Sequence, residues 1–298
     1  MAGIRKRSKH DKIWDTIIGI FMAIIVVATL YPILNTLAIS FNDGIDSVRG
    51  GIYIWPRVFS LQNYQTVFHN PKLAQAAFIS VSRTVVATVL QVFLTAMLAY
   101  VLSRKEFIFK KSLSVVYVLT MYVNGGMIPI YVLMKDLHLT NNFLVYILPG
   151  LVAAFNMIVL RTYMNGLPDG LVESAKIDGA GDFRIFIQII LPLCKPALAT
   201  VALFIAVGQW NSWFDSMLYC AQSPNLTTLQ YELMKVLSAA TQQGGAGTAD
   251  LAKNSGSIVT SQSIRSAITI VTALPIVFIY PFLQKYFISG LTIGGVKE

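Results

Sequence analysis

Six long stretches of this chain contain no charged residue. A helix needs about 20 mainly apolar residues to cross roughly 30 Å of hydrocarbon, and each stretch is long enough for one crossing. Backbone groups in lipid must be satisfied within the segment, and the stretches lack the alternating pattern of barrel strands. The sequence therefore predicts an all-α integral membrane protein with six transmembrane helices. The stretches are 16–42, 84–103, 112–134, 139–160, 196–214 and 266–284.

The predicted helices belong to one six-helix transmembrane domain over 14–290, between terminal segments 1–13 and 291–298. Of the 298 residues, 55% are hydrophobic and only 12% are charged, whereas an ordinary soluble domain carries roughly a quarter charged residues. This composition excludes a soluble enzyme, a nucleic-acid-binding protein and a disordered chain. The predicted helices cover approximately 14–41, 77–103, 112–134, 142–162, 197–220 and 266–288.

The distribution of Lys and Arg indicates the orientation, because these residues resist translocation. With the N-terminus inside, fifteen of the 23 Lys and Arg residues lie in cytoplasmic pieces and eight, including Arg83, in external pieces. Both termini are therefore predicted to be cytoplasmic. This topology accounts for the net charge of +9 without any nucleic-acid partner. The external segments 43–83 and 221–265 are long enough to meet a soluble partner, or they are tolerated insertions.

The segment 167–196 on the cytoplasmic side is predicted to form a short helix-turn-helix. Pro168 and Asp169 can start the first helix and Gly179 can end it. Asp182 can cap the second helix, which Pro192 then stops. The first helix is expected to place Leu171, Val172, Ala175 and Ile177 on one face, and the second to include Phe183, Phe186 and Ile190. Such a rigid projection can transmit a push from a partner.

The same segment resembles the EAA loop of permease subunits in binding-protein-dependent ABC importers. Ser174 stands where that family usually has Ala, a small substitution. The resemblance implies that 167–196 is a coupling loop docked into a groove on a cytoplasmic ATPase. The coupling residues it implies are Glu173, Ser174, Ala175, Asp178, Gly179, Ala180, Leu191 and Pro192.

Further motifs are similar to those of carbohydrate-uptake permeases of the maltose-permease type, with the MetI-like fold. They are 99–104, 125–131, 155–161, 209–215 and 280–287. The resemblance implies a bacterial plasma-membrane importer subunit that passes oligosaccharides by alternating access. It also implies three kinds of partner: a second, homologous permease subunit, a cytoplasmic ATPase dimer, and an extracytoplasmic solute-binding protein.

No catalytic site or metal site is predicted on this chain. The sequence has no GxxxxGK[ST] phosphate cradle, so ATP and Mg²⁺ are expected on the partner ATPase. The three histidines are scattered over different segments. The acids of 169–182 recur at helical spacing beside Lys176 and Arg184, which is typical of an ion-paired face.

Polar residues at the outer part of the fifth stretch are the main candidates for a sugar path. A sugar in transit needs hydrogen-bonding groups and aromatic faces, and polar residues at this depth are costly unless they face a cavity or a partner helix. The alternative is an interfacial aromatic belt with Asp215 in external water. The candidates here are Gln209, Trp210, Asn211, Trp213 and Asp215.

Two other helices supply path candidates. Asn124, with Gly125 and Gly126, is predicted to interrupt the third helix, and broken helices often expose backbone groups to a cavity. The glycines would equally suit close helix packing. Asn156 in the fourth helix is a further candidate, with interhelical hydrogen bonding as its competing role.

Two rival functions stay open at this stage. The EAA pattern is shared with importers of other solutes such as peptides and polyamines. An ion-driven secondary transporter would carry an acid or His deep in the bundle, and Asp215 is the only acid near the interior of a predicted helix.

Overall fold

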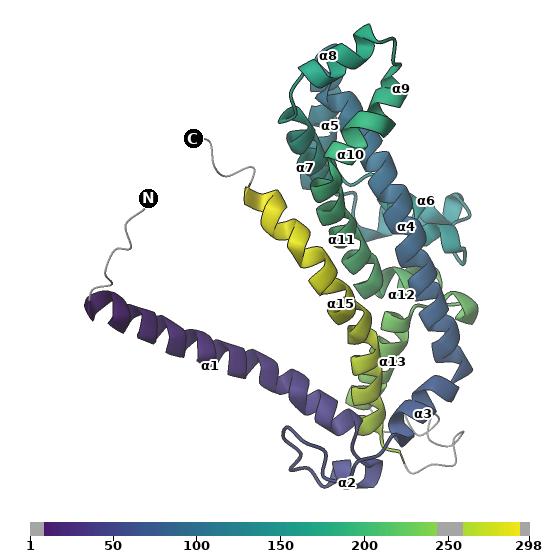
Figure 1. Ribbon diagram of the computed structural model, residues 1–298. Coiled ribbons are helices and arrows are strands. Elements are labelled where there is room, and N and C mark those ends of the chain that lie inside the picture. Colours follow the sequence, from purple (N-terminus) through teal and green to yellow (C-terminus); the bar gives the residue numbers. More distant parts are fainter. Residues whose placement is uncertain (1–8, 243–258, 293–298) are drawn as a thin grey trace. The chain divides into compact units, whose positions relative to one another are not determined.

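The computed structural model describes residues 9–242 and 259–292, and every regular element in these two ranges is helical (Figure 1). An antiparallel bridge between Asn42 and Phe59 is isolated from any strand. The tail 293–298 and the centre of the segment 221–265, which is predicted to be external, lie outside the described residues. The longest helices are α1 (Lys9–Ser40), α4 (Pro71–Ser103) and α15 (Ser261–Thr292).

The remaining elements are shorter and follow the chain in order. They are α2 (Gly44–Val48), α3 (Gln62–His69), α5 (Lys110–Tyr122), α6 (Met127–Asp136), η1 (Phe143–Tyr146), η2 (Leu148–Gly150), α7 (Ala154–Asn165), α8 (Gly170–Ile177), α9 (Asp182–Ile185), η3 (Phe186–Ile190), α10 (Leu191–Leu193), α11 (Lys195–Asn211), α12 (Phe214–Tyr219), η4 (Pro224–Leu226) and α13 (Leu229–Gln242).

Within the described residues, three helical segments are long and apolar enough to cross a bilayer: Lys12–Ser40, Pro71–Ser103 and Ser261–Ile279. Three bent pairs of helices also pass this test when each pair is taken together. The bends are 116° between α5 and α6, 48° between Phe143–Gly150 and α7, and 83° between Asp182–Leu193 and α11. Length and composition therefore allow up to six spans.

Three predicted helices are interrupted in the structure. The helix expected over 112–134 breaks at Asn124–Gly126, as its sequence predicts: Gly126 has φ +86°, and its N–H donates to Asn124 Oδ1 at 2.9 Å. The helix expected over 142–162 is instead a pair of 3₁₀ turns followed by α7. The helix expected over 197–220 ends at Asn211, because Ser212 is extended, and resumes as α12.

The described chain divides into two compact units, which we treat separately. Unit 1 comprises Met1–Asn70 and Val236–Val271, and unit 2 comprises Pro71–Lys235 and Thr272–Glu298. In unit 2, α4 packs along α7 and α11 (Figure 1). Two apolar clusters lie there: a small one that includes Ala87, Tyr146 and Cys220, and a large one that joins α4, α7 and α11 to the segment 172–194.

Unit 1 is organised beyond α1 by a buried asparagine. Asn42 Nδ2 donates to Asp46 Oδ2 and to Ser47 Oγ, both at 3.1 Å, and Asn42 Oδ1 accepts from the N–H of Val58 at 2.8 Å. Arg57 Nε donates to Asp46 Oδ2 at 2.9 Å. These bonds, that of Arg57 first and that of Asn42 second, lower the pKa of Asp46. The network fixes α2 and the loop after it to the end of α1.

Replacing Asn42 with alanine is expected to loosen this external segment. The change leaves the Val58 N–H without its acceptor, and an unmade buried hydrogen bond costs about 1–3 kcal/mol. Limited proteolysis within 43–60 should become faster, while cleavage elsewhere is unchanged. Asn225→Ala, a change of the same size at an exposed position outside this network, is the control. Unchanged proteolysis of Asn42→Ala would contradict the organising role.

Candidate functional site

The helix α8 ends in a Schellman motif built on Gly179. The N–H of Ala180 donates to Ala175 O at 2.9 Å, and the N–H of Gly179 donates to Lys176 O at 3.0 Å. Gly179 has φ +78°, a left-handed conformation that glycine adopts without steric cost. This motif turns the chain sharply into α9, so the segment is a helix-turn-helix.

The apolar residues of α8 divide between two faces. Val172 and Ala175 are buried, whereas Leu171 and Ile177 are exposed, Ile177 to 87%. The expectation that all four share one face was wrong, because at 100° per residue Leu171 and Ile177 point far from each other and from Val172. Val172 and Ala175 anchor α8, and Ile177 is presented outward.

The second half of the loop is one helical rod with a π-helical turn. It begins at Asp182 after an N-cap at Gly181, passes through η3 and continues in α10. Asp182 is therefore not the cap, and Pro192 does not stop the helix: it directly follows the π-helical turn Phe186–Ile190, and the rod continues through it in α10. The rod ends at Cys194, and Pro196 lies in the first turn of α11.

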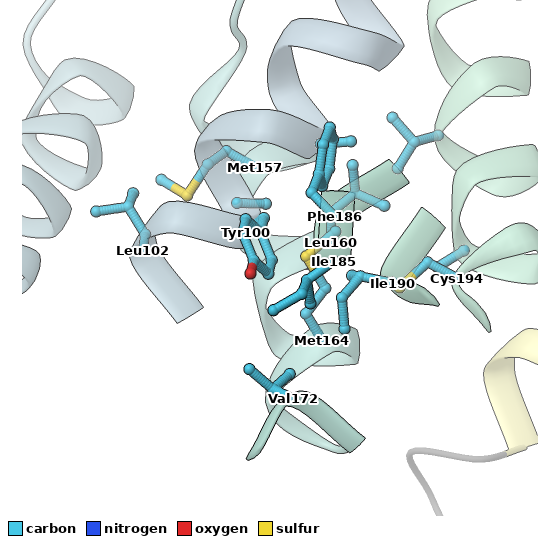
Figure 2. Close-up of a cluster of buried hydrophobic side chains, with 14 of the residues drawn as sticks. Tyr100, Leu102, Met157, Leu160, Met164, Val172, Ile185, Phe186, Ile190 and Cys194 are labelled. Carbon is cyan, nitrogen blue, oxygen red and sulfur yellow. The ribbon is translucent and has the colours of Figure 1, made fainter. Parts of the chain in front are cut away.

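The rod is packed into the large apolar cluster (Figure 2). The Phe186 ring lies 5.4 Å from that of Tyr100 and 6.0 Å from that of Phe93, both on α4, measured between ring centroids. Ile185 and Ile190 are fully buried in the same cluster. The cluster also includes Leu102, Met157, Leu160, Met164, Val172 and Cys194. A displacement of the rod must therefore act directly on α4 and α7, because close-packed side chains transmit strain.

Ion pairs add surface links between the connection 104–109 and the first helix of the loop. Lys105 Nζ lies 2.6 Å from Asp169 Oδ2, and Lys176 Nζ lies 2.6 Å from Glu106 Oε2. The hydrogen bond from each lysine lowers the pKa of its carboxylate partner. Their contribution to stability is thus present above the ordinary carboxyl pKa of about 4, and it is lost as the pH falls through the lowered value. Such exposed pairs stabilise weakly.

The predicted coupling residues lie along this helix-turn-helix. Glu173, Ser174, Asp178 and Gly179 are exposed on α8 and its turn, and Pro192 is exposed on the rod. Ala175 is buried, and Ala180 and Leu191 are partly buried against the large cluster. The Ser174 hydroxyl donates to Gly170 O at 2.7 Å, so the serine is accommodated within its own helix. Contact of these residues with an ATPase stays a prediction.

Arg83 on α4 forms a second polar centre, buried in unit 2. The residue is 1% exposed. Its Nη1 and Nη2 donate to Oδ1 and Oδ2 of Asp215 at 3.1 and 2.5 Å. Its Nε and Nη2 also donate to Oε1 of Gln209 at 3.0 and 2.7 Å. The guanidinium carbon lies 4.3 Å from the centroid of the Tyr146 ring. This bidentate geometry with an aromatic face suits arginine and not lysine.

The Arg83 network lies where α11 gives way to α12. Asp215 Oδ1 also accepts from the Ser212 hydroxyl at 2.9 Å and from the N–H of Ser216 at 2.8 Å. Gln209 Nε2 donates to Tyr146 O at 3.3 Å. The network therefore joins α4, η1, α11 and α12, and it holds the break at Ser212 in place.

Sequence reasoning missed the pairing of Arg83, which it counted among the external charges. A signal was present: Arg83 immediately precedes the stretch 84–103, and Asp215 immediately follows 196–214. In the predicted topology these positions lie at the same membrane face, so opposite charges there are candidates for a pair. Asp215 is accordingly ion-paired with Arg83.

The other path candidates are dispersed. Trp210 is buried, and its Nε1 donates to Thr272 O at 2.8 Å. Asn211 is exposed and Trp213 is partly exposed. Asn124 is exposed and caps the break before α6, whereas Asn156 is buried on α7. The structure thus brings Gln209 and Asp215 together around Arg83, and a role in substrate passage stays a prediction for all seven.

The comparison with protein families decides the identity of the fold. The family described as "Binding-protein-dependent transport system inner membrane component" matches residues 1–293. The chain belongs to this family. Its resemblance to the permease subunits of binding-protein-dependent importers is thereby confirmed, and as an inner membrane component it is a transport protein and not an enzyme.

Relatives of this inner membrane component match it over nearly their whole length. The polygalacturonan/rhamnogalacturonan transport system permease protein YtcP of Bacillus subtilis (strain 168) is 34% identical over 288 residues, covering 96% of this chain and 99% of the relative. Protein LplC of the same organism is 36% identical over 292 residues, 97% of each chain. The arabinooligosaccharides transport system permease protein AraQ of Halalkalibacterium halodurans is 31% identical, covering 98% of this chain and 99% of the relative.

A solved structure has the same fold. It is the crystal structure of a bacterial ABC transporter involved in the import of the acidic polysaccharide alginate, and one of its chains matches this one with a TM-score of 0.88. The identity is 26%, and the match covers 95% of this chain and 99% of that one.

Proposed function

We propose that this chain is one permease subunit of an ATP-driven importer of oligosaccharides. Its partners would be a second, homologous permease subunit, a dimer of cytoplasmic ATPases and an extracytoplasmic solute-binding protein. ATP and Mg²⁺ would be held by the ATPase, and this chain would pass the sugar by alternating access. The bacterial plasma membrane would hold the chain with both termini in the cytoplasm.

The observation that carries the proposal is the packing of the coupling loop into the core of unit 2. An ATPase that grips α8 and α9 would move Phe186, which contacts α4, and Ile190, which is buried with α7 and α11. ATP-driven closure could therefore reach three helices through one buried cluster. A loop that merely connected two spans would not need this packing.

The sugar class rests on the relatives. Those with full-length matches include permeases named for polygalacturonan and rhamnogalacturonan, for arabinooligosaccharides and for galactooligosaccharides. The structural neighbour takes part in alginate import. The names of these relatives disfavour an importer of peptides or polyamines. An ion-coupled transporter is disfavoured because Asp215, the candidate acid for ion coupling, is ion-paired with Arg83.

Transport by the complete complex tests the proposal. The chain would be co-purified with its permease partner, ATPase and binding protein and reconstituted into proteoliposomes. Oligosaccharides from polygalacturonate, arabinan and galactan would be the probes. We expect uptake of at least one class that requires ATP and the binding protein and survives a protonophore. The proposal would be refuted by uptake that does not require ATP and is abolished by the protonophore. It would also be refuted if the complex transported only peptides.

The exposed apolar residues of the loop should bind the ATPase. Ile177→Asp is expected to weaken ATPase binding by about tenfold or more, because a buried apolar contact would be replaced by a desolvated charge. Folding should not change, since Ile177 is 87% exposed. The affinity can be measured as the binding of soluble ATPase to the permease complex immobilised on a surface. Val48→Asp is the control, because Val48 is also apolar and exposed but lies in the segment predicted to be external. Equal affinity for the two variants would contradict the docking assignment.

A further inference from the structure

The loop after α2 in unit 1 folds back onto the end of α1. Asn35 Nδ2, one turn before the end of α1, donates to Ile52 O at 2.7 Å and to Tyr53 O at 2.9 Å. An amide side chain on a long apolar helix thus binds the backbone of an external loop. The residues Tyr53, Ile54 and Trp55 are thereby held beside α1 and not out in the external solution.

The return path of the loop is fixed as well. Arg57 is paired with Asp46 and donates to Gly50 O at 2.9 Å, so it closes the loop across its base. The N–H of Asp43 donates to Val58 O at 2.8 Å, and the N–H of Ser60 donates to Phe41 O at 2.8 Å. The loop is held at both ends and at its centre, so its tip presents a defined surface.

That surface is aromatic and apolar. Tyr53 is 65% exposed, Ile54 57% and Trp55 83%. Three adjacent large side chains left open to water by a well-bonded backbone need an explanation, because isolated exposed hydrophobic residues are ordinary but contiguous ones mark an interaction surface. Trp and Tyr with a cationic neighbour are the side chains that membrane–water interfaces favour, and Arg57 supplies that cation.

The position of Asn35 along α1 matches the depth of such an interface. The segment Lys12–Ser40 is strongly apolar, and its residues 12–33 are all exposed, as expected for a helix that faces lipid; burial begins only near its end, at Ala38 and Ser40. From Thr16, where the uncharged stretch begins, Asn35 is about 28 Å along the helix axis. A hydrocarbon core is roughly 30 Å thick, so Asn35 and the loop bound to it lie at the outer edge of the hydrocarbon, next to the lipid headgroups.

We propose that Tyr53, Ile54 and Trp55 form an anchor that inserts into the outer lipid headgroup region, held there by the hydrogen bonds from Asn35. The occupant is the bilayer surface, because the tip is hydrogen-bonded to α1 close to the end of its apolar segment. The external segment 43–83 is then not wholly available to a soluble partner. The anchor would fix the depth of α1 in the bilayer. The inference requires the family's membrane location but not the sugar specificity.

Fluorescence quenching of Trp55 tests this in the complete transporter in nanodiscs. The chain has four tryptophans, so the contribution of Trp55 is taken as the difference between the native protein and Trp55→Phe. We expect this difference signal to be quenched by lipids brominated near the headgroup and to be protected from iodide. Strong iodide quenching with no lipid quenching would overturn the proposal. So would a blue shift or protection that appears only when binding protein is added.

A spin label gives an independent measurement. Both native cysteines are buried, so Tyr53→Cys can be labelled selectively, and Val48→Cys serves as the control in the same external segment. At position 53 the label should collide more with oxygen, which concentrates in lipid, than with a water-soluble nickel chelate; at position 48 the order should be reversed. Asn35→Ala combined with Tyr53→Cys should shift the label toward water. Equal nickel accessibility at the two positions would refute the anchor, as would an Asn35→Ala variant whose label keeps its depth.

Discussion

Asp215→Ala is expected to lower the free energy of unfolding of unit 2 by about 3–5 kcal/mol. The change leaves the guanidinium of Arg83, 1% exposed, without its counter-charge, and an unpaired buried charge is among the most costly defects in a protein. Thermal unfolding can be followed with a thiol-reactive dye, because Cys194 and Cys220 are both buried and free. The dye signal should rise at a markedly lower temperature than in the native protein.

The double variant Arg83→Met with Asp215→Leu is the decisive control. Replacing both partners of a buried ion pair with apolar residues of similar size is often neutral or stabilising. The double variant should therefore recover most of the loss, which the additive sum of the single variants would not predict. If Asp215→Ala unfolded at the native temperature, or if the two losses simply added, the pair would not be a structural unit.

Phe186→Ala is expected to cost about 3–5 kcal/mol and to uncouple transport from hydrolysis. The ring lies between Tyr100, Phe93 and Phe183, with centroid distances of 5.4, 6.0 and 6.3 Å. Its removal leaves a cavity where the rod meets α4. We expect the assembled complex to hydrolyse ATP while the sugar imported per ATP falls by about tenfold. The reason is that a loosely packed rod would transmit less of its displacement to α4.

Phe78→Ala supplies the comparison for that measurement. Phe78 is also on α4, but it is exposed, so its truncation should leave both stability and the sugar imported per ATP near native values. A Phe186→Ala complex that transported normally would show that motion passes through another contact. The surface pairs Lys105–Asp169 and Lys176–Glu106 would then be the next to remove.

Local features of this fold follow from the sequence because their causes are local. The break before α6 is visible in Asn124, Gly125 and Gly126, and the turn after α8 in Gly179, because these residues allow backbone conformations that others resist. The break at Ser212 carries no such signal. It is stabilised by Asp215, whose main partner, Arg83, is 132 positions away in the sequence.

The candidate coupling loop was predictable as a projection but not as a packed element. Its caps and prolines indicate two helices, and the family resemblance indicates their role. Helical spacing alone separates Ile177 from Val172, but which of these two faces is buried depends on where α4 and α7 lie, which a single helix does not encode. The π-helical turn at Phe186–Ile190 likewise carries Pro192 into the rod, against the usual reading of proline as a stop.

The chain bends sharply at Cys194, where the rod Asp182–Leu193 meets α11 at 83°. The rod is about 18 Å long. A sideways shift of a few ångströms at its tip would therefore rotate α11 about its own axis. Rotation needs no vertical movement of a span through lipid. Such a rotation would turn Gln209, near the far end of α11, while Asp215 lies beyond the break on α12, so the hydrogen bonds that both residues share with Arg83 would be strained.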